Sequence, residues 1–99
     1  MEDIKFIIEE GNKDFGEVKV YALSTCAFCK KALKYLRDNK IKFMYIYVDD
    51  LAPDNKQELK ERLKETYKKE VGFPFMIING DQVIVGFKEE EYKNLFPEE

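Results

Sequence analysis

The run Phe-Met-Tyr-Ile-Tyr-Val at positions 43–48 constrains the fold more than any other stretch of the chain. Every residue in it is apolar or aromatic. A strand with one solvent-facing side alternates polar and apolar residues, so an unbroken apolar run is typical of a strand covered on both faces. We therefore expect this strand inside a sheet that has helices on both sides.

The segments before this run complete a strand–helix–strand unit. The stretch from Val18 to Leu23 is rich in β-branched and apolar residues, which predicts a short strand. Apolar residues then recur at steps of three and four, which predicts an amphipathic helix of about a dozen residues that ends near Asp38. Because the return to positions 43–48 is short, we expect the two strands to be parallel and the crossover to be right-handed.

The second half of the chain predicts two helices and a hairpin. A helix is expected from Pro53 to Glu70, with the proline at the first position, where no amide hydrogen is needed. Two β-forming runs, 75–78 and 82–85, flank Asn79-Gly80-Asp81. Asn-Gly in this setting is a strong hairpin signal, because both turn residues need positive φ. A short last helix is expected from Lys88 to about Phe96.

The alternation of Ile4, Phe6 and Ile8 predicts an additional strand at the N-terminus. An outer position beside residues 43–48 would explain why that run is apolar throughout. The order is then β-α-β-α-β-β-α with an extra N-terminal strand, which resembles the thioredoxin-like three-layer α/β sandwich. We expect residues 1–99 to form one domain, with 1–17 as an N-terminal extension that carries the extra strand.

Composition excludes several classes of function. The 99 residues carry a formal net charge of -3 and no long basic run, so nucleic acid is not an expected partner. No apolar run approaches the roughly 20 residues that cross a bilayer, and the acidic start Met1-Glu2-Asp3 lacks a signal-peptide pattern. We therefore expect a cytoplasmic protein with no membrane partner. Thiols stay reduced in the cytoplasm, where a lone cysteine pair is catalytic more often than structural.

Both cysteines of the chain, Cys26 and Cys29, lie at the first strand-to-helix junction. This spacing puts the Cys26 sulfur at a helix N-terminus, where unpaired N–H groups and the positive end of the helix dipole favour a thiolate. Cys29 lies one turn further on, within reach of a disulfide with Cys26. We interpret the pair as a dithiol redox centre. Cys26 attacks a disulfide, and Cys29 then releases the product by closing the Cys26–Cys29 disulfide.

The same cysteine pair has a second interpretation. A Cys-x-x-Cys can supply half of a Zn²⁺ or Fe–S site that two chains share, which would make the protein a non-enzymatic metal or cluster carrier. The chain has no histidine and no third cysteine, so one chain alone cannot complete a four-ligand site of thiolates or imidazoles. We therefore expect no metal in a single chain and favour redox exchange.

From Val18 to Phe96 the chain resembles the glutaredoxin family of the thioredoxin fold. The resemblance rests on Cys26-Ala27-Phe28-Cys29 in place of the family's Cys-Pro-Tyr-Cys, on Phe73-Pro74 in place of its Val-Pro, and on a hairpin followed by Gly86. It implies a thiol–disulfide oxidoreductase that reduces protein or low-molecular-weight disulfides. It also implies no bound cofactor beyond the redox-active disulfide, and a cis Pro74 opposite the cysteines. We expect a monomer.

Two departures from the family pattern bear on the electron donor. Members that bind glutathione carry Gly-Gly after the hairpin and a lysine shortly before the first cysteine, whereas this chain has Gly86-Phe87-Lys88 and Leu23-Ser24-Thr25. The Gly86-Phe87-Lys88 end resembles the Gly-Phe-Arg of the glutaredoxin-like redoxins that serve ribonucleotide reductase, which thioredoxin reductase reduces. Both a reductase and external glutathione therefore stay open as the reductant.

The resemblance also implies a set of substrate-binding residues around the cysteines: Thr25, Phe28, Phe73, Pro74, Gly86 and Phe87. Phe28 is either a core residue or an exposed rim residue that touches the substrate, and we favour the rim. Phe73-Pro74 is either an ordinary helix stop or a docking element in which the Phe73 backbone pairs with the substrate chain, and we favour docking. For Phe87 a substrate contact and a position capping the core are equally well supported.

Overall fold

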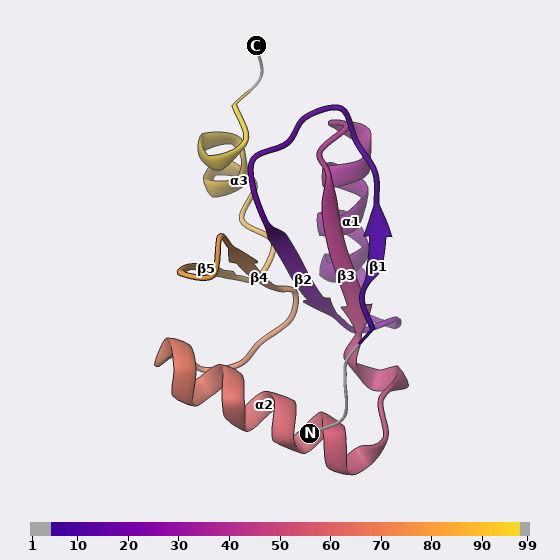
Figure 1. Ribbon diagram of the computed structural model, residues 1–99, viewed down its shortest axis with the longest axis vertical. Helices are drawn as coiled ribbons and strands as arrows, with labels where there is room; N and C mark the ends of the chain where they lie inside the picture. Colours follow the sequence, from indigo (N-terminus) through magenta and orange to yellow (C-terminus); the bar gives the residue numbers. More distant parts are fainter. Residues whose placement is uncertain (1–4, 98–99) are drawn as a thin grey trace.

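A five-stranded mixed sheet forms the middle layer of the computed structural model, which describes residues 5–97 (Figure 1). The strands lie in the order β1-β3-β2-β4-β5 across the sheet. Their bounds are β1 Ile7–Glu9, β2 Val18–Ala22, β3 Phe43–Tyr47, β4 Phe75–Ile78 and β5 Gln82–Val85. The helices are α1 Ala27–Asp38, α2 Pro53–Tyr67 and α3 Glu89–Leu95, and a 3-10 turn, η1 Val48–Asp50, follows β3.

The strand pairing confirms the predicted topology. β2 and β3 are parallel neighbours joined through α1, whereas β4 is antiparallel to β2 and β5 is antiparallel to β4. β1 is antiparallel to β3 at the outer edge of the sheet, which is the position expected for the extra strand. The described chain therefore has the mixed α/β thioredoxin-like fold.

The first strand begins later than the sequence pattern predicts. Ile4 lies outside the described residues, and Phe6 precedes β1, which starts at Ile7. The Phe6 ring instead packs edge-on against Tyr21, with 5.5 Å between ring centroids. Ile7 and Ile8 are 48% and 59% exposed. The strand therefore extends the hydrogen-bonded sheet but buries little apolar surface.

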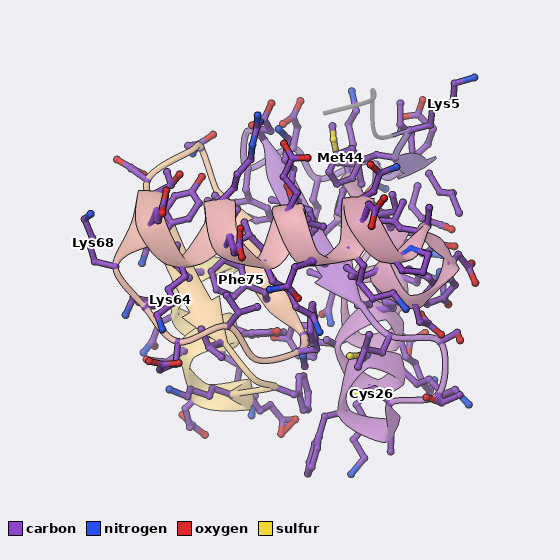
Figure 2. All side chains as sticks on the ribbon, turned by 90° about the horizontal axis from the view of Figure 1, so that it is seen from below. Lys5, Cys26, Met44, Lys64, Lys68 and Phe75 are labelled. Atoms are coloured by element: carbon purple, nitrogen blue, oxygen red, sulfur yellow. The ribbon has the colours of Figure 1, made fainter. Side chains whose placement is uncertain are left out.

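Helices cover both faces of the sheet, as the apolar run of β3 predicts (Figures 1 and 2). One buried cluster joins the sheet to α1 and α3, and includes Leu36 and Tyr92 from these helices. The other cluster joins the sheet to α2, and includes Leu59. Neighbouring residues of β3 divide between the two, with Tyr45 in the first and Ile46 in the second. This alternation places both sides of the strand in the core.

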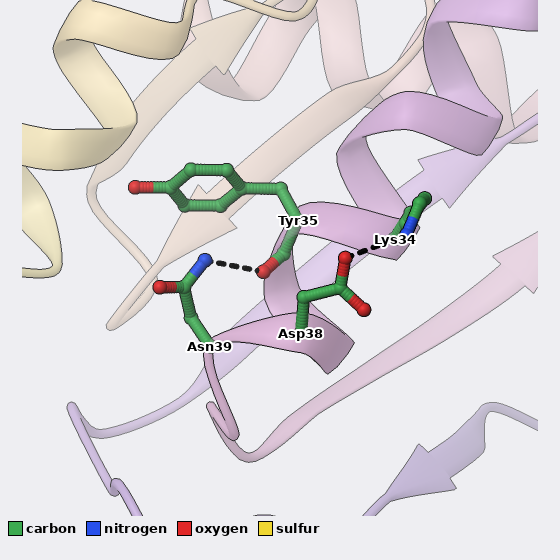
Figure 3. Close-up of polar contacts among 4 residues, drawn as sticks. All are labelled: Lys34, Tyr35, Asp38 and Asn39. Carbon is green, nitrogen blue, oxygen red and sulfur yellow. Dashed lines mark hydrogen bonds and ion pairs between the residues drawn. The ribbon is translucent and has the colours of Figure 1, made fainter.

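α1 ends where the sequence predicts. The side-chain amide of Asn39 donates a hydrogen bond to the Tyr35 carbonyl at 2.8 Å, and the Asn39 backbone N–H reaches the same carbonyl at 3.1 Å (Figure 3). Asp38 forms an ion pair with Lys34 across one turn at 2.7 Å. These contacts close the C-terminal end of the helix that carries the cysteine pair at its other end.

α2 is shorter than predicted. It begins at Pro53 as expected but ends at Tyr67 rather than Glu70, because Lys68 turns into the left-handed region at φ 55°. The Lys68 N–H still bonds the Lys64 carbonyl at 2.9 Å. Glycine or asparagine normally signals this kind of helix end, and lysine gives no such signal. No helix within residues 5–97 has the length and apolar character needed to cross a membrane.

The predicted hairpin joins β4 to β5, and its turn also contacts β2. Asn79 and Gly80 have φ of 52° and 78°, the positive values that Asn-Gly predicts. Asn79 Oδ1 accepts the Glu17 N–H at 2.8 Å, and the Asn79 N–H donates to the Glu17 carbonyl at 2.7 Å. The hairpin turn therefore holds the start of β2 in place.

Candidate active site

Cys26 occupies the N-terminal end of α1. β2 ends at Ala22, and a turn closed by the Cys26 N–H and the Leu23 carbonyl, 3.2 Å apart, carries the chain to the helix. Cys26 is the N-cap residue, and its Sγ accepts the Cys29 N–H at 3.2 Å. The first turn of α1 contains no acidic residue. The amide donor and the helix dipole both stabilise a thiolate at this sulfur.

Cys29 lies in a different environment one turn further along the helix. It has no exposed surface, whereas Cys26 is half-buried. The Cys29 Sγ accepts a hydrogen bond from the Leu23 N–H at 3.4 Å. Burial, followed by its hydrogen bond with Cys26, raises the pKa of the Cys29 thiol to about 12. Cys29 is therefore a neutral thiol at neutral pH, and the two sulfurs are chemically unequal.

The loop before β4 faces the first cysteine. The Phe73–Pro74 peptide bond is cis, as the resemblance implies. The Phe73 carbonyl oxygen lies 4.0 Å from Cys26 Sγ, close enough to accept the thiol hydrogen. Pro74 is buried and Phe73 is half-buried. Of the predicted substrate-binding residues, Phe73 thus lies next to Cys26, and Pro74 follows it in the same loop.

Gly86 and Phe87 follow β5, and Gly86 contacts this loop. The Gly86 N–H donates to the Pro74 carbonyl at 2.8 Å, and Gly86 has a positive φ of 88°. The half-buried Phe87 ring packs edge-on against Tyr92 at 5.1 Å between centroids. The structure therefore brings Gly86 to the proline loop and packs Phe87 against the core, the second of its two predicted positions.

Thr25 and Phe28 are both exposed beside the cysteines. Thr25 lies in the turn that precedes Cys26, and Phe28 is 58% exposed in the first turn of α1. The ammonium group of Lys31 lies 5.4 Å from the centre of the Phe28 ring, a cation–π distance. Phe28 is thus not a core residue, and the rim interpretation is the one that its exposure supports.

The contact between Ser24 and Asp49 is one that the sequence reasoning missed. The Ser24 N–H donates to Asp49 Oδ1 at 2.9 Å, and the Ser24 hydroxyl donates to Asp49 Oδ2. These two hydrogen bonds lower the pKa of the Asp49 carboxyl. Each residue lies just after the end of a strand, and β2 and β3 are parallel neighbours. Because both residues follow the ends of neighbouring parallel strands, their shared position at one edge of the sheet would have predicted the contact.

A metal site would need more ligands than this site supplies. Cys26 and Cys29 are both free thiols. Across residues 5–97, no group of three or more His, Cys, Asp or Glu side chains is arranged to hold a metal ion. A metal bound through the two cysteines would therefore take its remaining ligands from elsewhere.

Comparison with known proteins shows similarity in sequence and in overall structure. The glutaredoxin family model matches residues 18–83, a segment that contains both cysteines, the proline loop and the hairpin turn. An uncharacterised glutaredoxin-like 8.6 kDa protein in a rubredoxin operon of Clostridium pasteurianum is 34% identical over 79 residues. The alignment covers 79% of this chain and 95% of that protein.

Solved structures give the same result. The glutaredoxin of Methanosarcina mazei Go1 superposes with a TM-score of 0.79 and 37% identity, covering 98% of this chain and 92% of that one. Methanoredoxin from Methanosarcina acetivorans superposes with a TM-score of 0.77 and 35% identity, covering 89% of this chain and 90% of that one. The chain therefore belongs to the glutaredoxin family.

Proposed function

We propose that this protein reduces disulfides by thiol–disulfide exchange, with Cys26 as the nucleophile and Cys29 as the resolving thiol. Family membership supports a thiol oxidoreductase. The inequality of the two sulfurs carries the assignment of roles. Cys26 is half-buried and held by an amide donor at a helix start, whereas Cys29 is fully buried and neutral.

The first step transfers the substrate to Cys26. The Cys26 thiolate attacks one sulfur of the substrate disulfide, so that a Cys26–substrate disulfide forms and the substrate S–S bond breaks. The departing sulfur leaves as a thiolate and takes a proton from solvent. The Cys29 N–H stabilises the attacking sulfur before the step, because it already points at Cys26 Sγ at 3.2 Å.

The second step releases the product. Cys29 loses its proton and attacks Cys26 Sγ, which forms the Cys26–Cys29 disulfide and expels the second substrate sulfur as a thiol. Two electrons pass from the dithiol to the substrate in one cycle. Since burial keeps Cys29 neutral, it does not compete with Cys26 for the first attack.

The proline loop provides the docking element in this proposal. The Phe73 carbonyl lies beside Cys26, so an extended substrate strand that pairs with the Phe73 backbone would bring its disulfide to the nucleophile. Gly86 holds the other side of the loop through the Pro74 carbonyl. Exposed Phe28 and Thr25 would contact the substrate at the rim of the site.

A reductase or glutathione must return two electrons to the oxidised protein. Two assays distinguish these donors, one with glutathione and its reductase and one with thioredoxin reductase and NADPH, each using insulin as the disulfide substrate. We expect the cytoplasm to be the compartment in which this cycle runs, because thiols are kept reduced there.

Three single substitutions test the function itself. We expect Cys26→Ser to abolish insulin reduction and Cys29→Ser to lower it strongly, whereas Ala27→Ser, at the exposed position next to Cys26, leaves it unchanged. Near-normal turnover by both cysteine variants would refute the proposal. A stoichiometric Fe or Zn content that disappears in Cys26→Ser would instead assign the cysteines to metal transport.

A further inference from the structure

The parallel pairing of β2 and β3 brings two loops together at one edge of the sheet. Ala22 at the end of β2 is paired with Tyr47 at the end of β3. Two residues beyond these partners come Ser24 and Asp49, which therefore leave the sheet side by side. Asp49 lies within η1, the turn that carries the chain from β3 towards α2.

The Asp49 carboxylate binds Ser24 at two points. Oδ1 accepts the Ser24 backbone N–H at 2.9 Å, and Oδ2 accepts the Ser24 hydroxyl. Both residues are half-buried, whereas the next residue, Asp50, is exposed. Because both carboxylate oxygens bind the same residue, the two hydrogen bonds fix the orientation of Ser24 relative to Asp49 as well as the distance between them.

Ser24 lies in the turn that holds both sulfurs. The preceding residue, Leu23, donates its N–H to Cys29 Sγ at 3.4 Å and accepts the Cys26 N–H at 3.2 Å through its carbonyl. A shift of Ser24 would therefore change the hydrogen bonds at both ends of the dithiol. Within residues 5–97, Asp49 is the carboxylate that reaches this turn from another element of the fold.

We propose that Asp49 is a positioning residue for thiol–disulfide exchange. It anchors the 23–26 turn, so that Cys26 stays at the start of α1 and Cys29 stays buried one helical turn further on. The proposal rests on the proposed function, because it concerns the same two sulfurs. Asp49 does not touch the substrate in this role. It acts through Ser24 and the turn.

The charge state of Asp49 supports this role. The two Ser24 hydrogen bonds hold the pKa of the Asp49 carboxyl below its ordinary value. The carboxylate therefore stays ionised at neutral pH, where both of its oxygens remain hydrogen-bond acceptors. The same negative charge contributes, as a minor cause, to the raised pKa of Cys29.

The test compares Asp49→Ala with Asp49→Asn, using Asp50→Ala as the control. Both Asp49 variants remove the charge, but asparagine keeps a carbonyl oxygen that can accept the Ser24 N–H. The readout is the rate at which iodoacetamide alkylates Cys26 in the reduced protein between pH 5 and 9, assigned by peptide mapping. Steady-state kcat and KM for insulin and the thermal midpoint are measured alongside.

We expect Asp49→Ala to slow Cys26 alkylation at pH 7 at least fivefold, to move its pH midpoint upward and to lower kcat. Asp49→Asn keeps an acceptor for the Ser24 N–H but loses the carboxylate oxygen that binds the Ser24 hydroxyl, so its alkylation rate should fall between those of Asp49→Ala and the unsubstituted protein. Asp50→Ala should match the unsubstituted protein. A purely structural role would lower the thermal midpoint of Asp49→Ala without moving the pH midpoint, and that result would overturn the proposal. Faster alkylation in both Asp49 variants would overturn the proposal as well. The negative charge of Asp49 would then affect the reactivity of Cys26 more than its anchoring of the turn does.

One further variant keeps the test decisive. If Asp49→Ala does not fold, Ser24→Ala removes one of the two hydrogen bonds and should slow alkylation in the same direction. An unchanged rate in a folded Ser24→Ala variant would then count against the proposal. Alkylation needs no turnover, so the two failures are distinguishable. A protein that fails to reduce insulin but shows these rate differences refutes the proposed function and supports only the anchoring of the 23–26 turn by Asp49.

Discussion

The buried thiol of Cys29 gives a prediction whose size follows from the structure. The perturbation is Cys26→Ser, which leaves Cys29 as the single thiol and keeps a hydroxyl in the place of the first sulfur. Burial is the largest cause of the raised pKa of Cys29 and is retained in this variant. The Cys29 thiol should therefore react far more slowly than a cysteine in an unfolded chain.

The expected factor comes from the fraction of thiolate. With a pKa of about 12 for the folded protein against an ordinary value of 9.0, Cys29 is three units above the unfolded chain. At pH 8 the thiolate fraction is then roughly 10⁻⁴ in the folded state and roughly 10⁻¹ in the unfolded state. Cys26→Ser removes the part of the raised pKa that Cys26 causes, so the thiolate fraction should slow alkylation of the folded variant by more than tenfold and at most about a thousandfold. Loss of solvent access slows the reaction further.

The assay follows iodoacetamide incorporation by mass spectrometry in the folded variant and in guanidinium chloride. The folded rate should rise about tenfold per pH unit from pH 7 to 10 without levelling off, because the thiolate fraction keeps growing below the pKa. A folded rate within tenfold of the unfolded rate would refute the argument that burial keeps Cys29 neutral. So would a plateau near pH 8.

Three further substitutions test the surroundings of the site. Tyr92→Phe removes a hydroxyl that donates to the Gly86 carbonyl at 3.4 Å. Because this hydrogen bond is long, the free energy of unfolding should fall by about 0.5 kcal/mol, and the thermal midpoint by roughly 2–4 °C. Gly16→Ala places a side chain at a φ of 96° and against Asn79 Oδ1. The free energy of unfolding, measured in urea, should therefore fall by about 2–3 kcal/mol. Phe28→Ser should raise KM for insulin about fivefold, the equivalent of ~1 kcal/mol, and leave the thermal midpoint unchanged.

Each of these predictions has a contradicting result. For Gly16→Ala the control is Gly80→Ala, where φ is also positive but no atom lies within 4 Å, so equal losses would show that the Asn79 contact is unimportant. An unaltered KM in Phe28→Ser would remove Phe28 from the substrate-binding rim. If Tyr92→Phe lowers the free energy of unfolding by more than ~2 kcal/mol, the hydrogen bond to Gly86 does not account for the contribution of the hydroxyl.

The elements around the cysteines can be predicted from the sequence because their signals are local. The helix period, the Asn-Gly turn and the proline at the start of α2 each act over a few residues. The placement of Cys26 at the start of α1 follows directly from such a pattern. The cis bond at Pro74 is different, because the family resemblance implies it and the local sequence does not.

The contacts that the sequence reasoning missed join residues that are distant along the chain. Ser24 and Asp49 are 25 positions apart, and Glu17 and Asn79 are 62 apart. Each contact depends on which strand ends meet in the folded sheet, and no propensity or period contains that information. The early end of α2 at Lys68 has a related cause, since a lysine in the left-handed region reflects the path of the following loop and not its own preference.

The location of the covalent intermediate tests the central claim most directly. Reduced Cys29→Ser is mixed with a disulfide peptide, quenched in acid and mapped by mass spectrometry, with Cys26→Ser treated in parallel. The unequal sulfurs predict a stable mixed disulfide on Cys26 in the first variant and no adduct on the same timescale in the second. An adduct on Cys29 that forms as fast as the one on Cys26 would contradict the assignment of the nucleophile.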